Sequence, residues 1–283
     1  MSDTIIHAIA FEGWASVLLS DTTRLVAAAQ SVHALSPLAT AALGRLLTMG
    51  ALMGEQLKSE EESFALTIKG DGPLGALHVA AHTKGLVRGY VEHADAALPK
   101  TPQGKLDVGG GVGQGTLSVV RMRQGYEPYS CTVPLQTGEI AEDFAHYFVA
   151  SVQQPSAVML GVRLDRESHN VLTAGGMLLQ IFPGCPDEVV DQVEAFAKNL
   201  PQASLMFAEK TPGQALKDWF GDDCEVVYTG TPELFCTCSR EAMCRAVQGL
   251  PQADRDALAA EGGAELSCRY CGTSYRIAPA EFA

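Results

Sequence analysis

The residues best suited to chemistry are four cysteines near the C-terminus. Cys236 and Cys238 form a C-x-C pair and Cys268 and Cys271 form a C-x-x-C pair, with 29 residues between the pairs. Two close cysteine pairs that a folded connection brings together make a tetrahedral four-thiolate zinc site. Gly272, directly after the second pair, permits the tight turn of a zinc knuckle. The sequence therefore predicts one zinc ion bound by these four side chains.

The other cysteines and the histidines fit a metal site less well. Cys131 lies in a strand-like stretch, where we expect a small buried apolar residue. Cys244 follows the first pair within a helical pattern, and we expect it not to bind metal because the two pairs already complete a ligand set. Cys185 and Cys224 lie between the two ends of the chain and would become accessible to oxidants if that segment opened. No histidine follows His169, so the cysteine module offers no nitrogen ligand.

Composition limits the classes of protein to consider. The chain has 283 residues, of which 47% are hydrophobic, which is enough for a sizeable core and for two folded units. It shows neither a secretory signal nor an apolar stretch of membrane-spanning length, so we expect a cytoplasmic protein that does not associate with membranes. The formal charge of −13 disfavours binding to nucleic acid. In a reducing cytoplasm, clustered cysteines more often bind metal or sense oxidants than form permanent disulfides.

Residues 1–178 combine helical and strand patterns, which predicts an N-terminal α+β domain built on an antiparallel sheet. Ser36 and Pro37 supply an N-cap and a first-turn proline for a long buried helix over residues 38–57. A second helical pattern covers residues 139–152. Strands are predicted at residues 64–69, 76–80, 86–91, 116–121, 129–133, 157–164 and 171–182.

Two motifs in this domain resemble functional sites without the features that such sites need. The glycine-rich residues 109–115 lack the Gly-Lys-Ser/Thr ending of a phosphate-binding loop and precede a strand, so we predict a turn or flexible loop there. His78 and His82 share one face of a predicted strand but lie too far apart for easy chelation. No arrangement of nucleophile, base or paired carboxylates has positional support. The sequence therefore gives no argument for an enzyme.

Residues 179–231 predict a metastable helical linker. Proline and glycine interrupt the chain at residues 183–186, and residues 187–200 then form an amphipathic helix. A second short helix is predicted over residues 213–220. Helices of this length need tertiary packing to persist in water. The first of them presents an apolar stripe for such packing, formed by Val189, Val190, Val193 and Phe196.

Residues 232–283 predict a small C-terminal zinc-binding domain with helices at 240–247 and 252–260. A module of about 50 residues is usually too small for a core to hold it alone. Its fold should depend on the metal, since structural zinc contributes roughly 10–16 kcal/mol of apparent binding free energy. Thiolates are also the form of cysteine that reacts with oxidants. Loss of either pair to oxidation would therefore unfold the module.

At this point the chain resembles a known family, the redox-regulated holdase chaperones of the heat-shock protein 33 family. The resemblance rests first on Cys236 to Arg240 (CTCSR) and on Cys268 to Gly272 (CRYCG), whose spacing fits the family signature. Residues 174–180 (AGGMLLQ) resemble the end of the family's N-terminal domain. Residues 69–73 (KGDGP) together with Arg88 and Gly89 resemble its sheet region, so that the resemblance covers essentially the whole chain.

The resemblance implies a cytosolic chaperone that is not an enzyme and uses no ATP. Such a protein is zinc-bound and inactive when reduced. Under oxidative stress it forms two disulfides, which by resemblance are Cys236–Cys238 and Cys268–Cys271, and it releases the zinc. The zinc domain and then the linker unfold, and the oxidised protein forms a homodimer and binds unfolding client proteins.

Two other classes of protein remain open from the residues themselves. A zinc ribbon that binds nucleic acid would need a basic surface, whereas residues 232–283 carry five arginines and no lysine against seven acidic residues. A thiol–disulfide oxidoreductase would need one exposed C-x-x-C at the start of a helix. Here the C-x-x-C pair lies between strand-like stretches and has a matching second pair.

Overall fold

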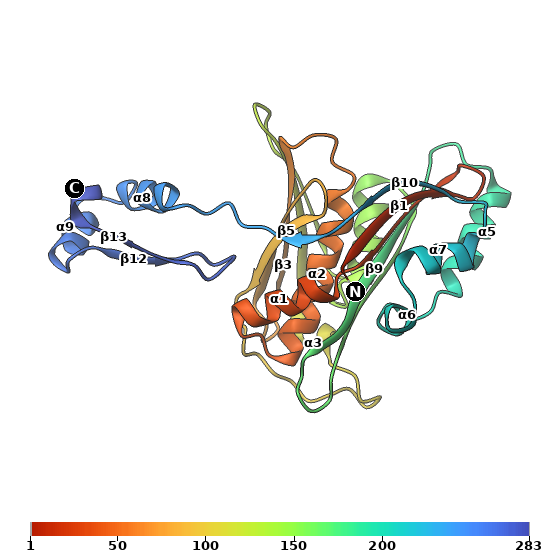
Figure 1. Cartoon of the computed structure of the whole chain (residues 1–283), viewed down its shortest axis with the longest axis horizontal. Helices are drawn as coiled ribbons and strands as arrows, with labels where there is room; N and C mark the ends of the chain where they lie inside the picture. The colour runs from red at the N-terminus through yellow and green to blue at the C-terminus, as the bar shows by residue number, and fades with distance from the viewer. Residues whose placement is uncertain (1, 283) are drawn as a thin grey trace. The chain divides into compact units, whose positions relative to one another are not determined.

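The computed structural model describes residues 2–282 and divides into two compact units, Met1–Leu234 and Phe235–Ala283. The first unit contains two large sheets with helices packed on them, and the second contains helices and a hairpin (Figure 1). The α+β class that the sequence predicts is confirmed. The predicted division of the chain after residues 178 and 231 stays a prediction.

The first sheet has five antiparallel strands in the order β10-β1-β2-β9-β8. β1 pairs with β2 without interruption, whereas a bulge between His7 and Ala8 interrupts its pairing with β10. The sheet therefore joins the start of the chain to a segment that follows the predicted linker helices. Its strands are β1 (Thr4–Ala10), β2 (Ala15–Asp21), β8 (Ser156–Leu164), β9 (Val171–Ile181) and β10 (Glu225–Gly230).

The second sheet has six strands in the order β11-β5-β4-β3-β6-β7. Neighbouring strands are antiparallel except for the two-residue β11, which runs parallel to β5. The Gly-Asp-Gly-Pro segment of residues 70–73 leads from β3 to its antiparallel neighbour β4. The strands are β3 (Glu62–Gly70), β4 (Ala76–His82), β5 (Leu86–Val91), β6 (Gly115–Arg123), β7 (Tyr129–Pro134) and β11 (Glu233–Leu234).

Helix α2 (Pro37–Gly54) is the centre of the first unit. Ser36 caps it as predicted, because the Oγ atom of Ser36 accepts a hydrogen bond from the Ala39 amide. From Leu38 onward every residue of the helix except Arg45 is buried. The helix contacts strands of both sheets, and α1 (Thr23–His33) packs beside it. Together these contacts form the main core of the protein.

The strands β1, β2 and β9 of the first sheet are buried on both faces. Leu18 and Leu178 face the core around α2, whereas Val17 and Leu179, one position along, face a second apolar cluster. Three helices that follow β9 cover this second face, and their buried side chains are Val193, Ala203, Met206, Phe207, Ala215 and Leu216. The helices are α5 (Asp187–Lys198), α6 (Ala203–Glu209) and α7 (Pro212–Phe220).

The strands β3 to β9 lie within a residue or two of their predicted ends, but other elements differ from the prediction. The stretch over residues 109–115 is not wholly irregular, since α3 (Val108–Val112) forms one short turn that Asp107 caps through the Gly110 amide. Residues 139–152 form α4 (Ala141–Tyr147) and a π-helical turn rather than one helix. The prediction places the strands on one sheet where the structure has two large ones, and it has no counterpart for β1, β2, α1, α6, β10 and β11.

The C-terminal unit is a hairpin with helices beside it. Its elements are α8 (Arg240–Gln248), α9 (Gln252–Ala260), β12 (Ala264–Ser267), β13 (Ser274–Ile277) and a 3₁₀ turn (Pro279–Glu281). The predicted helices match α8 and α9 to within a residue. The buried members of its apolar cluster are Val247, Ala264, Ile277 and Phe282.

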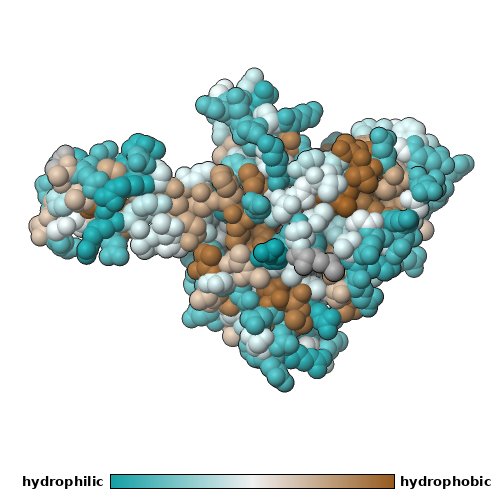
Figure 2. Space-filling view, in the orientation of Figure 1, coloured by the Kyte–Doolittle hydropathy of each residue, from teal (hydrophilic) through white to brown (hydrophobic). Residues whose placement is uncertain are grey.

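Two observations describe the surface of the protein. Figure 2 shows apolar surface on the face where Figure 1 places β10, and Val226 and Val227 of that strand are both exposed. Across residues 2–282, no helix combines the length and the apolar character that crossing a bilayer requires.

Candidate metal centre

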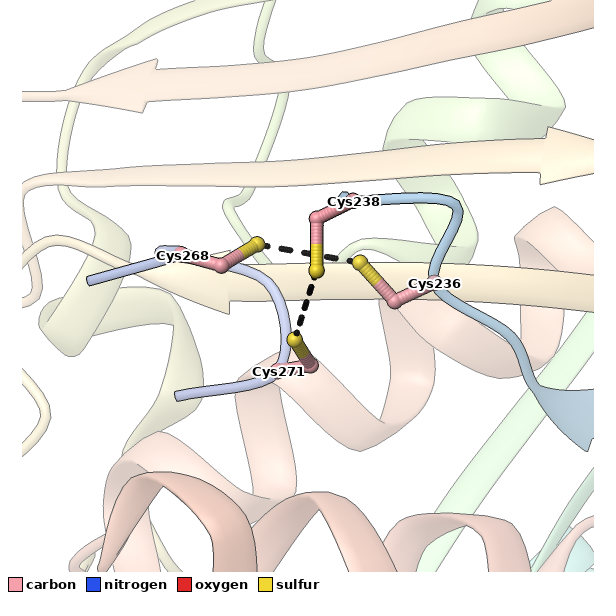
Figure 3. A group of neighbouring side chains, drawn as sticks. All are labelled: Cys236, Cys238, Cys268 and Cys271. Atoms are coloured by element: carbon pink, nitrogen blue, oxygen red, sulfur yellow. Dashed lines mark hydrogen bonds between the residues drawn. The ribbon is translucent and has the colours of Figure 1, made fainter. Parts of the chain in front are cut away.

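The four cysteines at the predicted zinc site lie together in the C-terminal unit. The Sγ atoms of Cys236, Cys238, Cys268 and Cys271 all lie within 4.8 Å of one another. Cys236 Sγ is 3.7 Å from Cys268 Sγ, and Cys238 Sγ is 3.4 Å from Cys271 Sγ. Figure 3 shows the four side chains pointing toward a common centre. No second cluster of potential metal ligands occurs within residues 2–282.

These separations fit four ligands of one tetrahedral ion. A Zn–S distance of about 2.3 Å places the sulfur atoms of a regular tetrahedron about 3.8 Å apart. A disulfide would need an S–S distance of about 2.05 Å, and none of the eight cysteines, all of which the structure describes, forms one. An all-sulfur donor set favours ions such as zinc over magnesium or calcium, which prefer oxygen. The cluster is therefore suited to a metal ion that binds thiolates.

The first pair lies in the extended segment that leads into α8. Ser239, directly after Cys238, caps this helix, because the Oγ atom of Ser239 accepts a hydrogen bond from the Ala242 amide. The cap fixes the direction in which the chain leaves Cys238. Arg240 then forms an ion pair with Glu281, which joins the start of α8 to the end of the chain that the structure describes.

The second pair lies in the turn of the β12–β13 hairpin. The amide of Cys268 donates to the carbonyl oxygen of Thr273 at 2.9 Å, and the amide of Gly272 donates to that of Cys268 at 2.8 Å. Gly272 has φ of 71°, a left-handed conformation that glycine adopts without steric cost. The predicted tight turn is present, and it directs both thiols of the pair into the cluster.

The pKa values of Cys238 and Cys271 are shifted in opposite directions. Burial raises the pKa of Cys271, but hydrogen bonds from Thr273 and Cys238 to its thiolate prevail and lower the pKa to about 6. The Tyr275 hydroxyl lowers the pKa of Cys238, yet burial and the neighbouring thiols prevail and raise it to about 12. Sulfur atoms this close cannot all ionise at neutral pH, since each thiolate opposes the next. A bound cation removes this repulsion and stabilises all four thiolates.

Two residues that contact the cluster are absent from the sequence prediction. Tyr275 Oη lies 3.1 Å from Cys238 Sγ, and Thr273 Oγ1 lies 3.3 Å from Cys271 Sγ. Hydroxyl donors to thiolate sulfur have no characteristic spacing, so the sequence prediction did not include them. The only available signal is that both residues closely follow the C-x-x-C pair.

The remaining cysteines lie outside the cluster. Cys244 contacts the carbonyl oxygen of Glu281 instead, with Sγ at 3.1 Å. Cys131 lies in β7, partly buried, with its Sγ 2.9 Å from the hydroxyl of Ser151. Cys185 and Cys224 are partly buried against the cluster of apolar residues beneath α5 to α7. They flank the helices α5 to α7 in the chain.

The apolar stripe of α5 faces the first sheet. Val193 is 3% exposed, and Val189, Val190 and Phe196 are partly buried in the same cluster. Phe196 is the centre of a group of aromatic rings, with ring centroids 5.8 Å from Phe11, 5.4 Å from Trp219 and 5.1 Å from Phe220. The helix is thus docked on the turn between β1 and β2 and on α7.

The position of the C-x-x-C pair argues against an oxidoreductase. In such enzymes the first cysteine opens a helix, whose N-terminus stabilises the attacking thiolate. Cys268 and Cys271 instead occupy a hairpin turn and face a second cysteine pair. The fold and the site together define a two-unit α+β protein whose C-terminal unit carries a four-cysteine metal cluster.

Comparison with known proteins gives the family. The model of the Hsp33 protein family matches residues 3–278. The 33 kDa chaperonin of Desulforamulus reducens is 39% identical over 98% of this chain and 95% of its own length. The 33 kDa chaperonin of Thermus thermophilus is 42% identical over 98% of this chain and 84% of its own length. The crystal structure of the Thermotoga maritima 33 kDa chaperonin superposes with a TM-score of 0.91 at 36% identity, covering 100% of this chain and 97% of that one.

The chain therefore belongs to the Hsp33 family. It is a chaperonin of that family and not an enzyme, and it carries a C-terminal four-cysteine cluster suited to metal.

Proposed function

We propose that this protein is an ATP-independent holdase that oxidation switches on. In the reduced state Cys236, Cys238, Cys268 and Cys271 hold one zinc ion, and the protein is inactive. Oxidation converts the four thiolates to disulfides, the ion leaves, and the C-terminal unit and the linker of residues 179–231 unfold. The oxidised protein dimerises in the cytoplasm and binds unfolding client proteins.

The observation that supports this proposal most strongly is that the C-terminal unit combines a four-cysteine cluster with a small apolar core. Four thiols meet within 4.8 Å in a unit whose buried apolar residues are few and mostly small or medium in size. Structural zinc contributes roughly 10–16 kcal/mol of apparent binding free energy, more than a core of this size supplies. The same four thiolates are the groups that an oxidant attacks. One reaction therefore removes both the ligands and the fold.

The proposed oxidation is balanced with peroxide as the oxidant. Two molecules of hydrogen peroxide accept four electrons from four thiolates and, with four protons, give two disulfides and four water molecules. The ion is left without ligands and is released. Once formed, the disulfides persist until a reductant returns four electrons.

We place the disulfides within each pair, as Cys236–Cys238 and Cys268–Cys271. Sulfur separations of 3.7 Å from Cys236 to Cys268 and 3.4 Å from Cys238 to Cys271 instead run between the pairs. Bonds between the pairs would replace the metal by covalent links and keep the module closed. Bonds within the pairs leave the first segment and the hairpin unconnected, which is the result that an unfolding switch needs. Peptide mapping of the oxidised protein by mass spectrometry distinguishes the two pairings.

We assign the transmission step to the linker helices. α5 depends on packing, since its apolar stripe contacts the first sheet and α7 while most of its other residues are exposed. Short helices of this kind do not persist without a docking surface. Unfolding of the C-terminal unit removes the folded anchor at one end of the segment that carries them.

The decisive experiment follows zinc and client together. Reduced protein should hold one zinc per chain and fail to suppress aggregation of a thermally unfolding enzyme. Peroxide with mild heat should release the zinc and suppress light scattering without nucleotide. The Cys244→Ser variant is the matched control, because it removes a thiol of the same unit that lies outside the cluster. Equal suppression by the reduced, zinc-loaded protein would refute redox control.

A further inference from the structure

One short segment covers an edge of each sheet. β10 is the outermost strand of the first sheet, where it pairs with β1, and β11 is the outermost strand of the second, where it pairs with β5. Pro232 lies between the two strands, buried and against Gly85. We name residues 225–234 the edge strap.

The edge strap is held mainly by its backbone. Val226 and Val227 are 52% and 57% exposed, and Glu225 and Thr229 are exposed too. Its contribution to the main core comes from the partly buried Tyr228 and Leu234. A strand with backbone pairing and little side-chain burial opens locally at low cost. The edge strap is thus easier to detach than the strands beneath it.

The strands beneath are apolar. In β1, Ile5 and Ala8 are fully buried and Ile6 is 6% exposed. In β5, Val87 is fully buried and Val91 nearly so. Without the strap, β1 would become a sheet edge with a row of unpaired amides and carbonyls, and β5 would lose its pairing at Leu86 and Val87. Long apolar edges of this type pair readily with other extended chains, which is why proteins keep them covered.

The strap lies between α5 to α7 and the C-terminal unit, both of which the proposed function unfolds, and residues 225–231 of the strap are themselves part of the linker that unfolds. Its first residue follows α7 closely, and only Phe235 separates its last residue from Cys236. When both flanking elements unfold, the strap is held in position at neither end, and its effective concentration at the two edges falls.

We infer that unfolding clients bind to the edge of β1 as added strands, in the place that β10 of the edge strap occupies in the reduced protein. This inference rests on the proposed function and adds the surface on which clients are held. The occupant is an extended segment of a non-native polypeptide, rich in β-branched and aromatic residues as in Val226, Val227 and Tyr228 of the strap. Strand addition binds mainly through main-chain hydrogen bonds. Clients of unrelated sequence are therefore accommodated.

Residue-resolved hydrogen exchange on the full-length protein tests this. In β1, the amides that donate to β10 should exchange at least about tenfold faster after oxidation and regain protection when a denatured client is added. The amides of β1 that face β2 are the internal control and should stay protected throughout. The inference is overturned if the β10-facing amides never lose protection, or if a bound client leaves them unprotected. It is also overturned if protection returns without client as protein concentration rises, because a second copy then occupies the edge.

Light scattering on the same samples distinguishes a failure of the proposed function from a failure of this inference alone. If the oxidised protein does not hold the client in solution, the proposed function fails and this inference fails with it. If the client is held but the β1 edge stays unprotected, only the inference fails.

A labelled peptide of the strap sequence, residues 225–234, tests the role of the backbone. It should bind the oxidised protein and bind the reduced protein at least about tenfold more weakly, because the edge of β1 is covered there. The same peptide with every second amide N-methylated keeps its side chains but cannot pair along one edge. It should bind the oxidised protein at least about tenfold more weakly than the unmodified peptide. Equal binding of the two peptides would show that apolar contact suffices and would overturn the inference.

Discussion

Buried apolar residues are distributed very unevenly between the two units. In the first unit, α2 is buried along almost its whole length between two sheets, and large side chains such as Leu46, Met49 and Phe144 are fully enclosed. In the second unit α9 has no buried residue, and the buried cluster consists of Val247, Ala264, Ile277 and Phe282. Since apolar burial is the main favourable term in folding, the first unit can hold itself together. The second needs the contribution of a bound metal.

This difference in apolar burial gives the two units different roles. A stable unit preserves the client-binding surface during stress, while a unit held by four thiolates responds to the oxidant itself. The linker helices lie between these extremes, because they dock on the stable unit but are short, and α5 has Val193 as its only buried residue. The predictions below alter each of these regions in turn.

The largest effect should come from the metal ligands. The double variant Cys268→Ser, Cys271→Ser should lose zinc and unfold residues 235–282, because most of roughly 10–16 kcal/mol of apparent binding free energy disappears. Zinc stoichiometry and amide spectra of both units measure this, with Cys244→Ser as the control. Full zinc occupancy in the double variant would remove the basis of the comparison between the units.

A smaller effect is expected from a charged side chain on the buried face of α5. Val193→Asp places an unpaired carboxylate at a site that is 3% exposed and should undock α5 at a cost of a few kcal/mol. The segment should open with zinc still bound, giving partial holdase activity without oxidant. Hydrogen exchange over residues 185–230 is the measurement.

The control for this variant is Val149→Asp, the same change at a residue that is 58% exposed, which should leave exchange unaltered. Unchanged protection in Val193→Asp, or opening without activity, would show that the linker does not control client binding.

A third prediction concerns how the stability of the first unit depends on pH. Burial raises the pKa of Glu55 to about 7, and its Oε1 atom is buried without a hydrogen-bond partner among the described residues. The folded state therefore holds a proton that the unfolded state releases, so stability falls as pH rises from about 4.5 to about 7.

Glu55→Gln should accordingly stabilise the first unit at pH 8 by about 1.5 kcal/mol and change little at pH 4. This stabilisation is smaller than the free energy to which the full pKa difference corresponds, because the carboxyl is partly exposed and solvent screens its charge. Denaturant unfolding at the two pH values measures it. A stabilisation that is equal at both pH values would contradict the assigned titration, and a change in zinc affinity would contradict the independence of the units.

The smallest effect is expected at the knuckle. Gly272→Ala must hold a side chain at φ of 71°, which costs about 1 kcal/mol. Zinc affinity should fall about fivefold while the first unit is unaffected, as competition with a chelator would show. Gly262→Ala, also at positive φ but outside the hairpin turn, is the control and should leave zinc affinity nearly unchanged.

Much of the fold could be predicted because its signals are local. Ser36 and Pro37 mark the start of α2, and alternating apolar residues mark most strands. The edge strap could not be predicted in this way, since β10 has few buried side chains and pairs with a strand from the start of the chain. The cysteine cluster was predictable because spacing alone indicates a four-thiolate site. Tyr275 and Thr273 were not, because their contacts with sulfur depend on the geometry of the hairpin.

The central claim is that one oxidation event unfolds the C-terminal unit and the linker and leaves the main core of the first unit intact. Its most direct test is residue-resolved hydrogen exchange during a peroxide titration, with zinc release followed in the same sample. Protection in residues 235–282 should fall in step with zinc release, while the amides of α2 and of β3 to β6 remain protected at every point. The account is contradicted if zinc leaves while residues 235–282 stay protected, or if α2 and the strands β3 to β6 lose protection together with them.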